Sequence, residues 1–95
     1  MINIRRLIWD DWNVVHIARH SVTPEEVEQV CHTHPIVQKG KKGRLLVFGP
    51  TKKSRMLTVI LDPEKEKGVY YPVTAYKASK KLIKIYLSEK GGEDK

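Results

Sequence analysis

The fold is decided by residues 36–76, IVQKGKKGRLLVFGPTKKSRMLTVILDPEKEKGVYYPVTAY. Four short runs in this stretch are rich in β-branched and aromatic residues, and segments containing glycine, proline and lysine separate them. The runs are Ile36 to Lys39, Arg44 to Phe48, Met56 to Leu61 and Val69 to Tyr76. Connections of these lengths suit hairpins, so we expect four antiparallel strands.

The last of these strands has two distinguishable faces. Strict alternation places Val69, Tyr71, Val73 and Ala75 on one face and Tyr70, Pro72, Thr74 and Tyr76 on the other. A proline has no backbone N–H to give to a ladder, so Pro72 indicates an edge or a bulge.

Two helices are expected before the strands. Thr23 and Glu26 form a capping box around Pro24, which predicts a helix that ends before Pro35. Its expected buried stripe consists of Val27, Val30 and Cys31. An earlier helix is expected from Asp10 or Asp11 to about Arg19, with Val14, Val15 and Ala18 on one side, and Ile2 to Ile8 is expected to form a short strand.

A final helix is expected over Ala78 to Ser88. Its apolar side carries Ala78, Leu82, Ile85 and Tyr86, and Lys77, Lys80, Lys81 and Lys84 follow helical spacing on the other side. The predicted class is therefore α+β, with two N-terminal helices and a C-terminal helix packed on a small antiparallel sheet.

Composition predicts one soluble domain over residues 1–90, followed by a disordered tail at 91–95. The chain has 95 residues, 40% of them hydrophobic, which suits a single modest core. No apolar run is long enough for a signal peptide or a membrane span, so we expect a cytoplasmic protein without membrane contact.

The formal net charge of +7 favours a polyanionic partner. Between Glu28 and Asp62 the sequence has no acidic residue, and we interpret its cations as one cluster on two adjacent hairpin loops that could follow a phosphate backbone. These seven cations are Lys39, Lys41, Lys42, Arg44, Lys52, Lys53 and Arg55. The alternative is charge that serves solubility or heat adaptation.

Two further groups of residues could carry chemistry. His16 and His20 are one helical turn apart, but the HExxH motif of zinc proteases is absent, so we expect no metal and no cofactor. The alternative is a packed helix face of Trp9, Asn13, His16 and His20. Cys31 is expected to be a buried structural thiol. Tyr70 and Tyr76, if they share a face, would line one groove with Arg44 and Arg55 and stack RNA bases.

Several segments together resemble the BrnT family of type II toxins. They are Trp9 to Asn13, His16 to Val27, Gly43 to Val47, Gly49 to Thr51 followed by Arg55, and Val73 to Ala75 leading into a basic helix with Tyr86. The resemblance implies a RelE-like fold and a metal-independent ribonuclease that inhibits translation. It also implies an antitoxin, of ribbon-helix-helix type, that neutralises the toxin, and contact with DNA only through the toxin–antitoxin complex.

In such an enzyme, basic residues hold the phosphate while a proton-transfer group completes attack by a ribose 2′-hydroxyl. The catalytic residues so expected are Arg44, Arg55, Lys53, His20 and Tyr76, and the RNA-binding residues are Lys39, Lys41, Lys42, Lys52, Lys77 and Tyr70.

The chain departs from the family pattern at four positions. Tyr76 stands where the family has arginine, Leu82 and Ile83 replace a Glu-Arg pair, and Ser21 replaces glycine. A non-catalytic module that binds nucleic acid or an antitoxin is therefore the alternative function.

Overall fold

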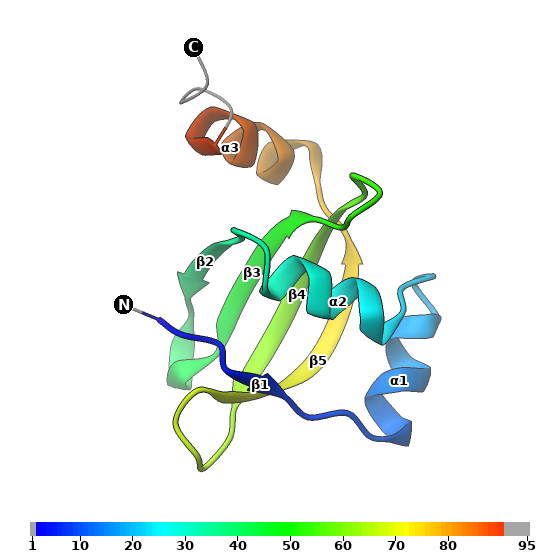
Figure 1. The fold of residues 1–95 in the computed structure, drawn as a ribbon, viewed down its shortest axis with the longest axis vertical. Coiled ribbons are helices and arrows are strands. Elements are labelled where there is room, and N and C mark those ends of the chain that lie inside the picture. The colour runs from blue at the N-terminus through cyan, green and yellow to red at the C-terminus, as the bar shows by residue number, and fades with distance from the viewer. Residues whose placement is uncertain (1, 91–95) are drawn as a thin grey trace.

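Five strands form one sheet in the order β1-β5-β4-β3-β2 (Figure 1), in a computed structural model that describes residues 2–90. The elements follow the chain as β1 (Arg6–Leu7), α1 (Asp11–Ala18), α2 (Pro24–Cys31), β2 (Ile36–Lys39), a 3₁₀ turn (Lys41–Gly43), β3 (Leu45–Pro50), β4 (Met56–Pro63), β5 (Val69–Lys77) and α3 (Lys80–Lys90). The predicted α+β class and the order of its elements are confirmed. The predicted tail at 91–95 lies outside the described residues.

The sheet is mixed, because its first strand runs parallel to its last. β2 to β5 pair antiparallel, as expected, but β1 pairs with β5 in parallel, with Arg6 opposite Val69. The expectation of a purely antiparallel sheet was therefore wrong at this edge. Two helices separate β1 from β2, so no hairpin turn forces the N-terminal strand to run antiparallel to a neighbour.

A bulge in β5 changes which tyrosines share a face. Ile60 pairs with Thr74 and Leu61 pairs with Pro72, so Val73 is an extra residue. Pro72 therefore lies beside a bulge, as predicted. Because the extra residue reverses the alternation, Tyr70 packs against the main core whereas Tyr76 pairs with Thr58 on the other face. The expectation that Tyr70 and Tyr76 share one face was wrong.

The main core lies between α2 and one face of the sheet. Val27 and Val30 of α2 are fully buried against a cluster that includes Val47 of β3 and Val59 of β4. The predicted stripe of α2 is confirmed, and Cys31 at its end is also buried. Each fully buried valine of this kind stabilises the fold by about 1.5–3 kcal/mol.

The buried face of α1 differs from the face that its aliphatic residues predict. Asn13 and Ile17 are its buried residues, while Val15 is 57% exposed. The Asn13 amide donates to the carbonyl oxygens of Ile8 (2.9 Å) and Pro72 (3.1 Å), and Asn13 also closes the capping box with Asp10. These polar contacts set the rotation of α1, so the expected side of Val14, Val15 and Ala18 was wrong.

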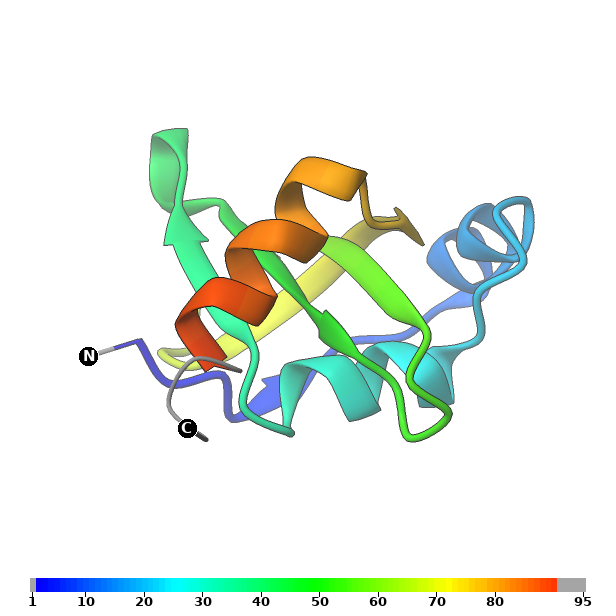
Figure 2. The ribbon, with the colours of Figure 1, turned by 90° about the horizontal axis from the view of Figure 1, so that it is seen from above.

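α3 lies on the opposite face of the sheet from α2 (Figure 2). Phe48 and Thr58 are fully buried on this face, yet no residue of α3 itself is buried. One contact that holds the helix is a hydrogen bond from the Tyr86 hydroxyl to the carbonyl of His34 (3.1 Å). Among the described residues, the Thr58 hydroxyl is buried without a hydrogen-bond partner.

No helix within residues 2–90 combines the length and the apolar character that crossing a membrane requires.

Candidate nucleic-acid interface

The two lysine-rich turns lie at opposite ends of the sheet. In an antiparallel sheet, consecutive connections alternate between the two ends, so the β2–β3 turn and the β3–β4 hairpin are separated by the length of β3. β3 has six residues, which corresponds to about 20 Å. Arg44 precedes β3 and Arg55 precedes β4, so they do not line one groove. The interpretation of a single cluster on adjacent loops was therefore wrong.

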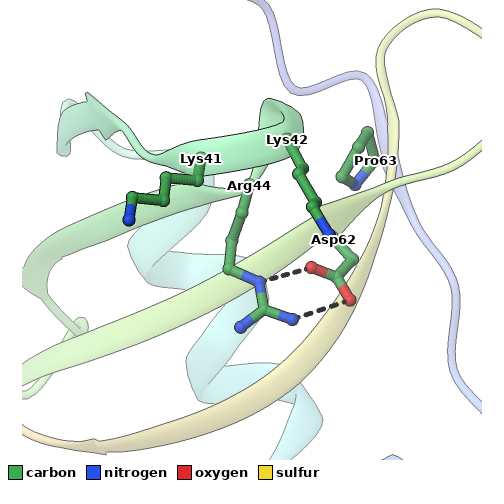
Figure 3. Close-up of a pocket in the computed structure, with 5 residues that line it drawn as sticks. All are labelled: Lys41, Lys42, Arg44, Asp62 and Pro63. Atoms are coloured by element: carbon green, nitrogen blue, oxygen red, sulfur yellow. Dashed lines mark hydrogen bonds and ion pairs between the residues drawn. The ribbon is translucent and has the colours of Figure 1, made fainter.

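We call the end that carries the β2–β3 turn the basic end, defined by Arg5, Lys39, Lys41, Lys42, Arg44 and Lys67. Its centre is Arg44, whose Nε and Nη2 donate to the two carboxylate oxygens of Asp62 at 2.6 and 3.2 Å (Figure 3). These hydrogen bonds and the charge of Asp62 raise the pKa of the Arg44 guanidinium above its usual value. The Arg44 side chain is nevertheless half exposed, and in the described part of the chain its Nη1 has no partner.

Lys41 and Lys42 stand next to Arg44 because the turn is tight. The backbone N–H of Gly40 donates to the carbonyl of Arg44 (2.7 Å), which closes the turn. Lys42 and Gly43 both have positive φ, at 58° and 78°. Glycine adopts this conformation freely, whereas lysine does so at a cost in free energy. The result is a cavity of about 690 Å³ lined by Lys41, Lys42, Arg44, Asp62 and Pro63.

A second, smaller cavity at the same end brings Lys39 and Tyr70 together. Its volume is about 330 Å³, and Arg5, Lys39, Lys67 and Tyr70 are among its lining residues. Arg5 forms an exposed ion pair with Glu66 (3.5 Å). Four of the predicted RNA-binding residues, Lys39, Lys41, Lys42 and Tyr70, therefore share the basic end with Arg44.

Arg55, at the other end, is held inside the protein's own structure. Its Nη1 donates to the Ser21 carbonyl at 2.6 Å and to both carboxylate oxygens of Glu26 at 3.2 Å. Its Nη2 donates to the carbonyl of His20 at 3.4 Å. Arg55 thus connects the α1–α2 segment to the β3–β4 hairpin, and both Nη1 and Nη2 of its guanidinium are used in hydrogen bonds within the protein.

Lys52 and Lys53 share their surface with acidic residues. The cavity that they line also contains Glu25, Glu26 and Gln29, and Gln29 accepts a hydrogen bond from the backbone of Lys52 (2.9 Å). The sequence interval around these lysines has no acid, but α2 brings two glutamates to them. This end is therefore close to neutral, unlike the basic end.

His20 and Tyr76, two of the predicted catalytic residues, do meet. Their ring centroids are 6.1 Å apart in an edge-on arrangement, and Lys77 follows Tyr76 in β5. Arg55 lies at the same end of the sheet as these two rings, because its Nη2 donates to the carbonyl of His20. Lys53 belongs to the adjacent β3–β4 hairpin, whereas Arg44 lies at the opposite, basic end.

Trp12 was not among the residues expected on the histidine face of α1. Asn13 is packed, as the alternative of a packed face expected, but Trp9 precedes the helix and its indole N–H donates to Glu28 (2.9 Å). Trp12 instead stacks on His16, with centroids 4.9 Å apart. The signal was present in the spacing, since Trp12, His16 and His20 recur every four residues.

Neither a metal site nor a reactive thiol is indicated in the described part of the chain. Over residues 2–90, no three His, Cys, Asp or Glu side chains are grouped so that they could hold an ion. Burial, with a smaller contribution from the charge of Glu28, raises the pKa of Cys31 to about 12, so its thiol is protonated near neutral pH.

The arrangement can bind an anion at the basic end, where three cations surround one carboxylate. It can also offer aromatic and imidazole rings on the flank formed by α1 and β5. Comparison with family models, with curated proteins and with solved structures finds no match to this chain.

Proposed function

We propose that this chain binds RNA through its basic end, as the toxin of a BrnT-like type II toxin–antitoxin pair. The observation that carries the proposal is the cavity in which Lys41, Lys42 and Arg44 surround the single carboxylate of Asp62. Asp62 orients the guanidinium of Arg44 but leaves its Nη1 free for a phosphate oxygen. A guanidinium fixed in this way loses little conformational freedom when it binds a phosphate.

The test compares two matched lysine pairs. K41Q/K42Q neutralises the basic end, and K52Q/K53Q neutralises the same number of lysines at the opposite end. Glutamine keeps most of the side-chain length. At position 42, where φ is positive, it replaces one non-glycine residue by another and so adds no new backbone strain.

Affinity for a single-stranded RNA is measured at a series of salt concentrations. On a single strand, each lysine that neutralises a phosphate contributes about 0.7 to the slope of log affinity against log salt. K41Q/K42Q should therefore weaken binding by about tenfold or more and reduce the slope by about 1.4. Equal effects of the two double variants, or RNA binding without salt dependence, would contradict the proposal.

Cleavage is the second part of the proposal, and the meeting of His20 with Tyr76 favours it. A neutral His20 imidazole would accept the proton of a ribose 2′-hydroxyl while the 2′-oxygen forms a bond to phosphorus. The bond from phosphorus to the 5′-oxygen breaks, and the departing oxygen takes a proton from water. The products are a 2′,3′-cyclic phosphate and a 5′-hydroxyl.

RNA is incubated with the protein in EDTA to test this step. We expect cyclic phosphate ends in the wild type and a loss of cleavage in His20→Ala at protein concentrations that saturate the RNA. If neither free RNA nor ribosome-bound message is cut, the chain is the non-catalytic module, and its RNA-binding function stands by itself.

The antitoxin is tested through the neighbouring gene. Expression of this chain alone should arrest translation, and co-expression with an adjacent ribbon-helix-helix reading frame should restore it. In this proposal the DNA contact belongs to the complex, so promoter DNA should bind the pair more tightly than it binds this chain alone.

A further inference from the structure

Four rings form a continuous ladder along one flank of the molecule. Trp12 stacks on His16 at 4.9 Å with an angle of 6° between the ring planes. His16 meets His20 edge-on at 6.0 Å, and His20 meets Tyr76 at 6.1 Å. α1 supplies the first two rings, the α1–α2 connection the third and β5 the fourth. We call this row the ring ladder.

Both ends of the ring ladder are open to solvent. Trp12 is 57% exposed and Tyr76 is 38% exposed. Trp9 provides the contrast, because it is half-buried against the core and its N–H is used by Glu28. An indole that packs on one histidine and faces solvent is available to a partner, and large exposed aromatics mark binding surfaces more often than they serve the fold.

The charges beside the ring ladder are arranged along it. A cavity of about 590 Å³ next to Trp12 and His16 is lined by Asp11, Val15 and Arg19 as well. Arg19 lies one turn beyond Val15 on the chain. The acid therefore stands at the Trp12 end and the cation stands towards the His20 end.

We propose that the ring ladder stacks unpaired bases of a single-stranded RNA, while Arg19 contacts its phosphates. This inference rests on the proposed RNA-binding function and assigns the class of RNA. A row of planar rings with polar imidazoles in its middle suits bases, which have a π-face and hydrogen-bonding edges. The imidazoles of His16 and His20 can hydrogen-bond base edges, and Arg19, which lines the cavity beside Trp12, supplies a charge for a phosphate.

The experiment separates bases from phosphates. Trp12→Ala removes the outermost ring, Trp12→Phe restores a ring, and Val15→Ala is the matched control because Val15 is equally exposed on the same helix. The probes are a ten-nucleotide oligoadenylate, an abasic oligomer of the same length, and the oligoadenylate paired with its complement. Binding is measured by fluorescence anisotropy, and thermal unfolding checks that each variant is folded.

Trp12→Ala should weaken binding of the oligoadenylate by about 5- to 150-fold, the range that corresponds to loss of one stacked base. Trp12→Phe should recover most of this loss, and Val15→Ala should change affinity by less than about twofold. Binding of the abasic oligomer and of the duplex should be unaffected by Trp12→Ala.

Three results would overturn the inference. Trp12→Ala and Val15→Ala could have equal effects, or Trp12→Ala could weaken the abasic oligomer just as much. Alternatively, Trp12→Ala could leave RNA affinity unchanged but abolish self-association or antitoxin binding, which would assign the surface to a protein. In each case K41Q/K42Q still tests RNA binding separately, and only a wild type that binds no RNA would remove the proposed function itself.

Discussion

Arg44 and Arg55 both stand immediately before a strand, yet they have opposite roles in the structure. Arg44 is 52% exposed and meets one carboxylate, whereas Arg55 is 35% exposed and meets one carboxylate and two backbone carbonyls. Asp62 orients Arg44 towards solvent. Glu26, Ser21 and His20 enclose Arg55 between α2 and the β3–β4 hairpin. A basic residue in a turn is available to a ligand only where the fold leaves some of its donors unused, as it leaves Nη1 of Arg44 among the described residues.

The largest expected effect is on stability, from Arg55→Ala. This change removes the bonds to Ser21 and Glu26 and leaves the Glu26 carboxylate, which is 25% exposed, without its ion-pair partner and with only the capping hydrogen bonds from Thr23. We expect the free energy of unfolding to fall by about 2–3 kcal/mol, measured by urea unfolding. Arg44→Ala is the control and should leave the unfolding midpoint unchanged. A destabilisation by Arg44→Ala as large as that by Arg55→Ala would remove the contrast.

The reactivity of Cys31 also distinguishes the structural role of Arg55 from that of Arg44. Its thiol is buried at the end of α2, and its pKa of about 12 leaves about one thiolate in ten thousand at pH 8. Native protein should therefore react slowly with iodoacetamide. Arg55→Ala should raise the alkylation rate by about 10-fold or more, because α2 loses an anchor and opens more often. The rate in Arg44→Ala should match the wild type, and equal rates in all three proteins would show that Arg55 does not hold α2.

A smaller effect should follow from changing the carboxylates. Asp62→Asn keeps an oxygen that can orient Arg44 but removes the negative charge from the basic end, so RNA affinity should rise about two- to fivefold at low salt. Glu26→Gln is the counterpart at the other end and should lower stability without changing RNA affinity. Weaker RNA binding by Asp62→Asn would mean that the carboxylate helps binding by orienting Arg44, and that this help outweighs the repulsion between its charge and the RNA.

The smallest effect concerns Asp10, a capping carboxylate outside both regions. A backbone hydrogen bond from Asn13 is the largest influence and lowers the pKa of Asp10 below its ordinary value of 3.8. Its ionised form therefore stabilises the fold at higher pH, and this contribution disappears as the pH falls through the lowered pKa. In Asp10→Asn the cap persists without a titrating group, so the loss of stability between pH 4 and 2 should be slightly smaller than in the wild type. Unfolding by urea at several pH values measures this difference.

The sequence predicted those parts of the fold that depend on local signals. The capping box at Thr23, the buried stripe of α2 and the bulge beside Pro72 follow from short-range patterns, and all are present. The parallel pairing of β1 could not be predicted, because it depends on residues that meet only in the folded chain. The rotation of α1 was hidden for another reason: the buried residue that orients it is a polar asparagine.

The candidate site was harder to predict than the fold. The acid-free interval is a property of the chain, but electrostatics depend on distance in space, and α2 places Glu25 and Glu26 beside Lys52 and Lys53. The alternation of hairpin ends could have been deduced from the predicted strands, and it would have separated Arg44 from Arg55. The ring ladder could have been partly foreseen from the four-residue spacing, but its continuation to Tyr76 required the structure.

The parallel pair of β1 and β5 has a consequence for the synthesis of the protein. A ribosome makes Arg6 and Leu7 early, but their partners Val69 and Tyr70 are added only when most of the chain has been translated. The sheet therefore closes late, after the whole of β5 has left the exit tunnel, and contacts so distant in sequence slow folding. Until then α1 has no β5 to rest on, and His20 cannot meet Tyr76. The flank formed by α1 and β5, with its row of rings, is therefore among the last parts of the described structure to assemble.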